Sequence, residues 1–119
     1  MTQTVTPYLL YEDAEAASEF LSRAFGFREI RRDGGHFEFE TPLGGIVHAG
    51  QPRAGYKNPS ASGRTSLTYV LVPDADVHCE RARHEGAEVF DEPQDQPYGH
   101  RRYGCHDPQG HEWWFASEL

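Results

Sequence analysis

Hydrophobic and polar positions along the first fifty residues predict a strand, a helix and three further strands. Residues Thr4–Tyr11 are rich in β-branched and aromatic side chains, which is typical of a strand. Asp13 suits a helix N-cap, and apolar residues then recur at helical spacing until Gly26: Ala17, Phe20, Leu21, Ala24 and Phe25. This spacing predicts a helix with one apolar face, ended by a glycine.

Strands are predicted next at 27–32, 36–41 and 45–50, separated by turn residues. The middle strand alternates, with Phe37 and Phe39 on one face and His36, Glu38 and Glu40 on the other. The charged face could line a concave surface or could simply be exposed to solvent.

The same order of elements restarts after a loop at 50–64. A strand is predicted at 65–72, a helix from Asp74 through Glu85, and strands at 88–90, 100–106 and 111–116, with a polar loop at 91–99. The apolar face of this helix is thin, so His78 and His84 are predicted to be solvated.

Local sequence supports a duplication. The segment Val72-Pro73-Asp74-Ala75 repeats the pattern of Tyr11-Glu12-Asp13-Ala14, about 60 residues apart. Any strand followed by a capped helix would look alike, but here the order of all elements repeats. The sequence therefore predicts an α+β fold of two tandem β-α-β-β-β units in one domain, 1–119, with unit one at about 4–50, a linker at about 51–64 and unit two at about 65–119.

Charge and composition narrow the partners. The chain has 119 residues and a formal net charge of −8, which disfavours nucleic acids and anionic membranes. It shows no apolar run of membrane-spanning length and no secretory signal, so a cytoplasmic location is expected. Cys79 and Cys105 lack the spacing of a zinc site and are interpreted as ordinary thiols.

The closing segment carries a family resemblance. Residues 97–101 (PYGHR) and 106–113 (HDPQGHEW) look like the YGxR and DPxGHxW ending of glyoxalase-like and bleomycin-resistance-like proteins, and Pro7–Ala14 with Phe25-Gly26-Phe27 fits the same group. The chain thus resembles the vicinal oxygen chelate superfamily over nearly its whole length. The resemblance implies a curved mixed sheet around a pocket, the glyoxalase/bleomycin-resistance/dioxygenase fold, and a homodimer.

Metal-dependent members of that superfamily hold a divalent ion with ligands from four strands. The resemblance assigns those positions to Thr6, His48, Leu67 and Trp114. Leu67 and Trp114 offer no metal-binding lone pair, so no metal cofactor is expected and a divalent ion would contradict this interpretation. A register shifted by one residue would instead bring Ser66 or Glu112 into the site.

The resemblance also predicts the lining of the pocket. Eight residues are expected to face it, with two more at its rim: Thr6, Tyr8, Leu10, His48, Leu67, Tyr69, Glu112 and Trp114, then Tyr98 and Arg101. Arg101 could instead pair with a carboxylate, and Tyr69 with Trp114 could simply fill a small core. His48 is the candidate hydrogen-bond partner or general base.

Three functions stay open at this point. The first is a metal-free protein that binds or sequesters a small, aromatic or cationic molecule, as bleomycin-resistance-like proteins do; the negative charge favours a cation. The second is a glyoxalase-like lyase or isomerase, or a dioxygenase-related enzyme, with His48 as base or ligand. The third is an accessory protein with a vestigial pocket.

Overall fold

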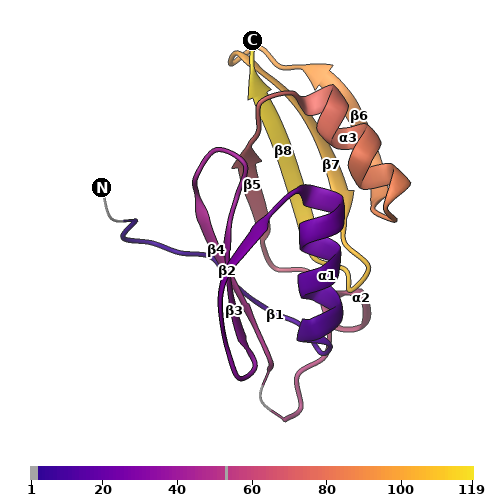
Figure 1. Cartoon of the computed structure of the whole chain (residues 1–119). Helices are drawn as coiled ribbons and strands as arrows, with labels where there is room; N and C mark the ends of the chain where they lie inside the picture. Colours follow the sequence, from indigo (N-terminus) through magenta and orange to yellow (C-terminus); the bar gives the residue numbers. More distant parts are fainter. Residues whose placement is uncertain (1–2, 53) are drawn as a thin grey trace.

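The computed structural model describes residues 3–52 and 54–119 and contains two similar units (Figure 1). Unit one consists of β1 (Tyr8–Leu10), α1 (Ala14–Phe25), β2 (Arg28–Asp33), β3 (His36–Glu40) and β4 (Ile46–Gly50). Unit two consists of β5 (Leu67–Leu71), α3 (Ala75–His84), β6 (Glu88–Asp95), β7 (His100–His106) and β8 (Glu112–Glu118). A short helix, α2 (Pro59–Ser62), lies between them.

Each unit forms one four-stranded mixed sheet. The strand orders are β1-β4-β3-β2 and β5-β8-β7-β6. The first strand of each unit runs parallel to the last, and the remaining pairs are antiparallel. The predicted α+β fold of two β-α-β-β-β units is confirmed.

The registers of the two sheets correspond position by position. Tyr8 lies opposite His48 across β1 and β4, and Tyr69 lies opposite Trp114 across β5 and β8. His48 thus corresponds to Trp114, and continuing across the next strand pair gives two further equivalences: His36 with Arg102, and Glu38 with Gly104. The same geometric positions thus carry different chemistry in the two units.

Helices α1 and α3 lie on the same side of the molecule and cover one face of each sheet (Figure 1). Aromatic rings fill the space between them, with Phe25 5.3 Å from Trp113 and 4.7 Å from Phe115 between ring centroids. Trp113 is fully buried on the side of its sheet that faces the helices. Among the described residues, no helix covers the opposite face of either sheet.

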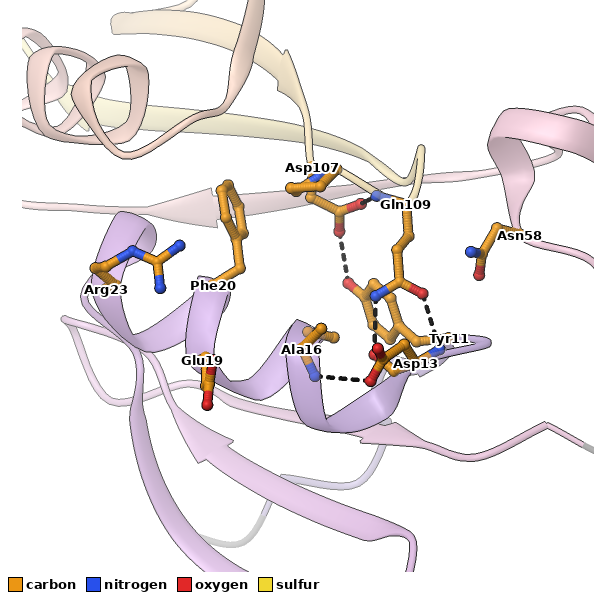
Figure 2. A pocket seen from close by; sticks show the side chains of 11 residues that line it. Tyr11, Asp13, Ala16, Glu19, Phe20, Arg23, Asn58, Asp107 and Gln109 are labelled. Atoms are coloured by element: carbon orange, nitrogen blue, oxygen red, sulfur yellow. Dashed lines mark hydrogen bonds between the residues drawn. The ribbon is translucent and has the colours of Figure 1, made fainter.

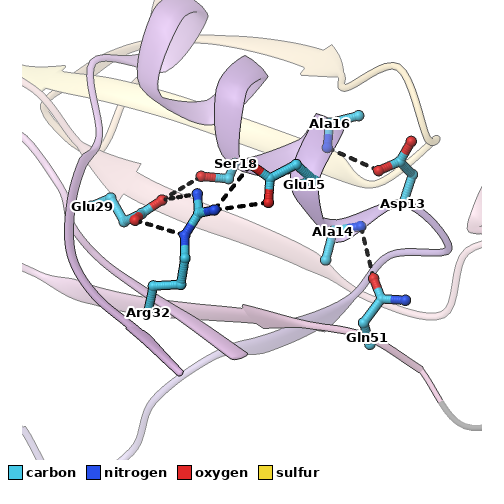
Figure 3. Close-up of polar contacts among 8 residues, drawn as sticks. All are labelled: Asp13, Ala14, Glu15, Ala16, Ser18, Glu29, Arg32 and Gln51. Carbon is cyan, nitrogen blue, oxygen red and sulfur yellow. Dashed lines mark hydrogen bonds and ion pairs between the residues drawn. The ribbon is translucent and has the colours of Figure 1, made fainter. Parts of the chain in front are cut away.

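Polar contacts fasten α1 to its surroundings (Figure 3). The Asp13 carboxylate accepts a hydrogen bond from the amide of Ala16 at 3.0 Å and caps the helix. Arg32 on β2 pairs with Glu15 of α1 and with Glu29. The Arg32 guanidinium is the main reason that the pKa of Glu29 is lowered. These contacts fix the side of the sheet that the helix covers.

Three expectations about the elements are corrected. β1 is shorter than Thr4–Tyr11 and begins only after Pro7, which has no amide to donate. β6 continues to Asp95 although 91–99 was expected to be a loop, because register shifts near Asp91 and Gln94 hide the alternation of a strand. α2 falls within the predicted linker loop.

His78 is buried, not solvated, with 8% of its surface exposed. Its Nε2 lies 2.9 Å from the carbonyl of Phe25 and its Nδ1 lies 2.5 Å from the hydroxyl of Tyr103. His84 is exposed, as expected.

Over the described stretches, no helix has the length and apolar character needed to cross a membrane.

Candidate functional site

The sheet faces turned away from the helices carry the functional side chains. Strand alternation sends Leu9 and Val70 into the core and leaves Tyr8 and Tyr69 exposed on the other side. On this uncovered side, unit one presents a polar face and unit two presents an aromatic face. The polar face is defined by Tyr8, His36, Glu38 and His48, and the aromatic face by Tyr69, Phe90, Arg102 and Trp114.

On the polar face, two imidazoles flank one carboxylate. His36 Nε2 lies 3.3 Å from Glu38 Oε2, and His48 Nε2 lies 4.0 Å from Glu38 Oε1. The ligand atoms of the three side chains all lie within 4.8 Å of one another. The Tyr8 hydroxyl lies 2.9 Å from Nδ1 of His36. His36, Glu38 and His48 are half-buried and Tyr8 is exposed, so the cluster is open to solvent.

On the aromatic face, rings and a guanidinium stack around a glycine. The Cζ atom of Arg102 lies 4.3 Å from the centre of the Trp114 ring, and Phe90 meets Trp114 edge-on at 5.3 Å. A Cβ atom on Gly104 would lie 2.8 Å from the Phe90 ring and 3.0 Å from the Trp114 ring. The absence of a side chain at Gly104 therefore leaves room for both rings above the backbone of β7.

Arg102, like Phe90, is a residue of this face that sequence reasoning missed. It is half-buried and makes no hydrogen bond or ion pair with any described residue, and its Nε atom is buried without a partner. Buried polar groups normally have partners, so an unpartnered guanidinium beside aromatic rings is unusual. The signal was available in the sequence. Alternation along this strand places Tyr103 and Cys105 on the core side, so Arg102 must lie on the opposite face.

Arg101, which was predicted at the pocket rim, lies on the helix side of β7. Its guanidinium pairs with Asp76 of α3 at 3.0 Å and with Asp95 at 2.9 Å. Its pKa is raised by these two carboxylates, Asp76 first. The alternative prediction, that Arg101 pairs with a carboxylate, is the one that the structure shows.

Tyr69 connects the aromatic face to β7. Its hydroxyl lies 2.7 Å from Nδ1 of His100. Partial burial, followed by the neighbouring Tyr98 hydroxyl, raises the pKa of Tyr69 to about 12. Tyr69 therefore stays a neutral hydroxyl near neutral pH and can donate a hydrogen bond.

A groove of about 520 Å³ runs between β1 and β5, where the two sheets meet. Five of the residues predicted to line a pocket line this groove: Tyr8, Leu10, Leu67, Tyr69 and Glu112. His48 and Trp114 lie on the adjoining polar and aromatic faces. Thr6 precedes β1, and Tyr98 is exposed with its ring 5.5 Å from His100.

The four-strand metal position of the related metalloenzymes does not fit these residues. Leu67 is an exposed hydrocarbon, and the Trp114 indole donates its N–H to Glu112 at 2.7 Å. Thr6 accepts a hydrogen bond from Gln3 at 3.2 Å. Only His48 of the four positions offers an imidazole lone pair, and one imidazole does not form a divalent metal site.

A second cavity, of about 380 Å³, lies beside α1 and the turn before β8 (Figure 2). Most of its polar groups are committed to hydrogen bonds or ion pairs within the protein. Asp107 accepts from the Tyr11 hydroxyl at 2.7 Å and from the Trp113 indole at 3.0 Å, and Gln109 bonds the backbone of Asp13. Burial, and then the charge of Asp107, raises the pKa of Tyr11. These hydrogen bonds stabilise the turn before β8, so this cavity is not taken as the candidate site.

With this geometry established, comparison with known proteins identifies the family. The family model described as the Glyoxalase/Bleomycin resistance protein/Dioxygenase superfamily matches residues 3–115. The chain belongs to this superfamily. Members of the superfamily often use a divalent metal and are often dimeric.

Solved structures of the superfamily share the fold. TioX from Micromonospora sp. ML1 is 33% identical and superposes with a TM-score of 0.80 over 99% of this chain and 100% of that one. The fosfomycin resistance protein FosX from Listeria monocytogenes is 15% identical, with a TM-score of 0.73 over 100% of this chain and 95% of that one.

An uncharacterized protein of Mycobacterium tuberculosis is 29% identical over 126 aligned positions, 92% of this chain and 71% of that protein.

Proposed function

We propose that this protein binds a small planar aromatic molecule on the aromatic face of unit two. The observation that carries the proposal is the set of large apolar side chains exposed on one uncovered sheet face. Phe90 is 44% exposed and Tyr69 is 40% exposed, although side chains of this size usually dominate a core or an interface. Exposed apolar surface grouped in this way marks a binding site more often than a plain surface.

The polar groups of this face indicate which polar atoms the ligand should carry. Arg102 offers guanidinium N–H donors with no partner in the described part of the chain, and the Tyr69 hydroxyl on the same face is neutral. A planar ring that bears a carboxylate or carbonyl oxygen would stack on the rings and accept from Arg102. This local positive charge favours an oxygen acceptor over the cation suggested by the net charge of −8.

The proposed binding requires no metal in unit two, because neither Arg102 nor Trp114 is a metal ligand.

We further propose that the protein is a cytoplasmic homodimer whose second copy covers part of the uncovered sheet faces. Size-exclusion chromatography with light scattering measures the dimer directly, and a monomer at all concentrations would contradict it.

The test of the ligand proposal is a thermal-shift screen of planar aromatic carboxylates, amines and neutral analogues, followed by calorimetry, all in the presence of a chelator. We expect the aromatic acids to raise the melting temperature most, because bound ligand stabilises the native state. Trp114→Leu should weaken binding about tenfold, since it removes one aromatic contact.

Arg102→Met keeps the methylene groups over Trp114 but removes the donors, and should weaken the acids more than the neutral analogues. Arg101→Met is the matched control, because it removes the same charge from the neighbouring residue on the helix side. Equal losses from Arg101→Met and Arg102→Met would show that charge, and not this site, governs binding. No stabilisation by any aromatic compound would refute the proposal.

A further inference from the structure

The three chemically competent ligands on the polar face of unit one come from adjacent strands. His36 and Glu38 are two residues apart on β3, so both point to the same side, and β4 places His48 directly opposite Glu38. All three belong to unit one, and two of them lie on a strand that the four-strand metal position does not use. This cluster is therefore a different arrangement from the one that the family resemblance implies.

The spacing of the ligand atoms suits one small ion. Two ligand atoms bound to a tetrahedral zinc ion at about 2.1 Å lie roughly 3.4 Å apart. Glu38 and His36 already meet that spacing at 3.3 Å, and His48 Nε2 is 4.0 Å from the carboxylate. Small side-chain rotations would bring the third ligand into range without any movement of the strands.

Tyr8 supplies the contact that holds one imidazole for coordination. Its hydroxyl lies 2.9 Å from Nδ1 of His36. When Nδ1–H donates to that hydroxyl, the Nε2 lone pair faces Glu38 and is free to bind an ion. A partner of this kind on the remote ring nitrogen is the usual companion of a metal-bound histidine.

Within the described part of the chain, Glu38 lacks the arginine partner that several acidic side chains on the sheets have. Glu29, Glu40 and Glu92 each pair with an arginine. Arg31 lies opposite Glu38 across β2 and β3, yet it forms no ion pair with it within 4.0 Å in the described residues. Among the described residues, the basic groups within 4.0 Å of this carboxylate are the imidazoles of His36 and His48.

We propose that His36, Glu38 and His48 bind one first-row divalent transition metal ion, such as Zn²⁺, at the uncovered face of unit one. Two imidazoles and a carboxylate favour such an ion over Mg²⁺ or Ca²⁺, which prefer all-oxygen sites. Three protein ligands leave a coordination position open toward solvent. The proposal is independent of aromatic binding in unit two, and it reverses the expectation of a metal-free protein.

The experiment is a calorimetric titration of tag-free, chelator-treated protein with Zn²⁺ and Co²⁺, with metal analysis after dialysis. We expect one ion per chain, and no comparable uptake of Mg²⁺. Glu38→Gln, which preserves shape, and His36→Gln should each abolish stoichiometric binding. Tyr8→Phe should weaken binding about 10- to 100-fold, as loss of a partner behind a ligand does.

Unit two offers matched controls. His106→Gln removes a histidine whose Nδ1 lies 2.7 Å from Glu88, a pair without a third ligand, and Tyr69→Phe removes the corresponding tyrosine. Both should bind the ion like the wild type. Circular dichroism and the unfolding midpoint in chelator verify that each variant is folded. Absence of uptake by the wild type, or uptake unchanged in Glu38→Gln, would overturn the proposal whatever the aromatic screen shows.

Discussion

Acidification should destabilise the protein through His78, which is buried between α3 and the core. Its Nε2–H donates to the carbonyl of Phe25 at 2.9 Å, and its Nδ1 accepts from the hydroxyl of Tyr103. The pKa of His78 is lowered from 6.5 to about 4, mainly because burial desolvates the imidazole. The hydrogen bond to the Phe25 carbonyl opposes this shift, and the nearby charge of Arg81 contributes to it. Protonation would place a second N–H against a hydroxyl that now points its own proton at the ring.

The sign follows from the two pKa values. Above pH 6.5 the imidazole is neutral in both states, and its contribution to stability is fully present. Between about pH 6.5 and pH 4 the unfolded chain binds a proton that the native chain refuses, so stability falls as the pH falls. A pKa lowered from 6.5 to about 4 corresponds to about 3 kcal/mol, a large share of the stability of a domain this size.

Urea unfolding of the wild type and of His78→Gln across this pH range measures the effect. Glutamine can donate to one partner and accept from the other, but it does not titrate there, and the difference between the two proteins cancels all other titrating groups. We expect the wild type to lose up to about 3 kcal/mol more than the variant between pH 6.5 and pH 4. His84→Gln, on the exposed part of the same helix, should behave like the wild type. Parallel curves for wild type and His78→Gln would refute the reasoning.

Two further substitutions test the packing that positions the site. Asp107→Ala should lower the free energy of unfolding by about 2–5 kcal/mol in urea titration, because the buried Tyr11 hydroxyl and Trp113 indole each lose their acceptor; a loss well below 1 kcal/mol would contradict that role. Gly104→Ala should displace Phe90 and Trp114, whose rings lie within 3.0 Å of the added Cβ, and weaken aromatic binding while leaving metal uptake in unit one unchanged; unaltered aromatic affinity would mean that these rings do not form the binding surface.

The duplicated fold was predictable because its signals are local. Asp13 and Asp74 cap the two helices, and strict alternation places Trp113 in the core and Trp114 outside it. The end of β6 was not predictable, since register shifts break the alternation on which the prediction of a strand depends. Burial of His78 depends on Phe25, which lies 53 residues earlier in the chain, and no helical pattern reports such a contact.

The candidate site was predictable only in part, because it depends on pairing between strands. The sequence placed His36 and Glu38 on one face, but only the register of β3 against β4 shows that Glu38 lies opposite His48. Arg101 and Arg102 are adjacent, and β7 sends one toward α3 and the other onto Trp114. The resemblance to metalloenzymes assigns the ligands to four strands, and it therefore does not predict this neighbouring cluster.

The equivalence of His36, Glu38 and His48 with Arg102, Gly104 and Trp114 has an evolutionary meaning. Once a unit is copied within one chain, each copy holds the same set of positions in a sheet of the same register. One copy can then acquire ionisable groups while its twin acquires rings. The matched positions therefore mark where exchanges between the two surfaces can be designed, and they are a record of how the two halves differ.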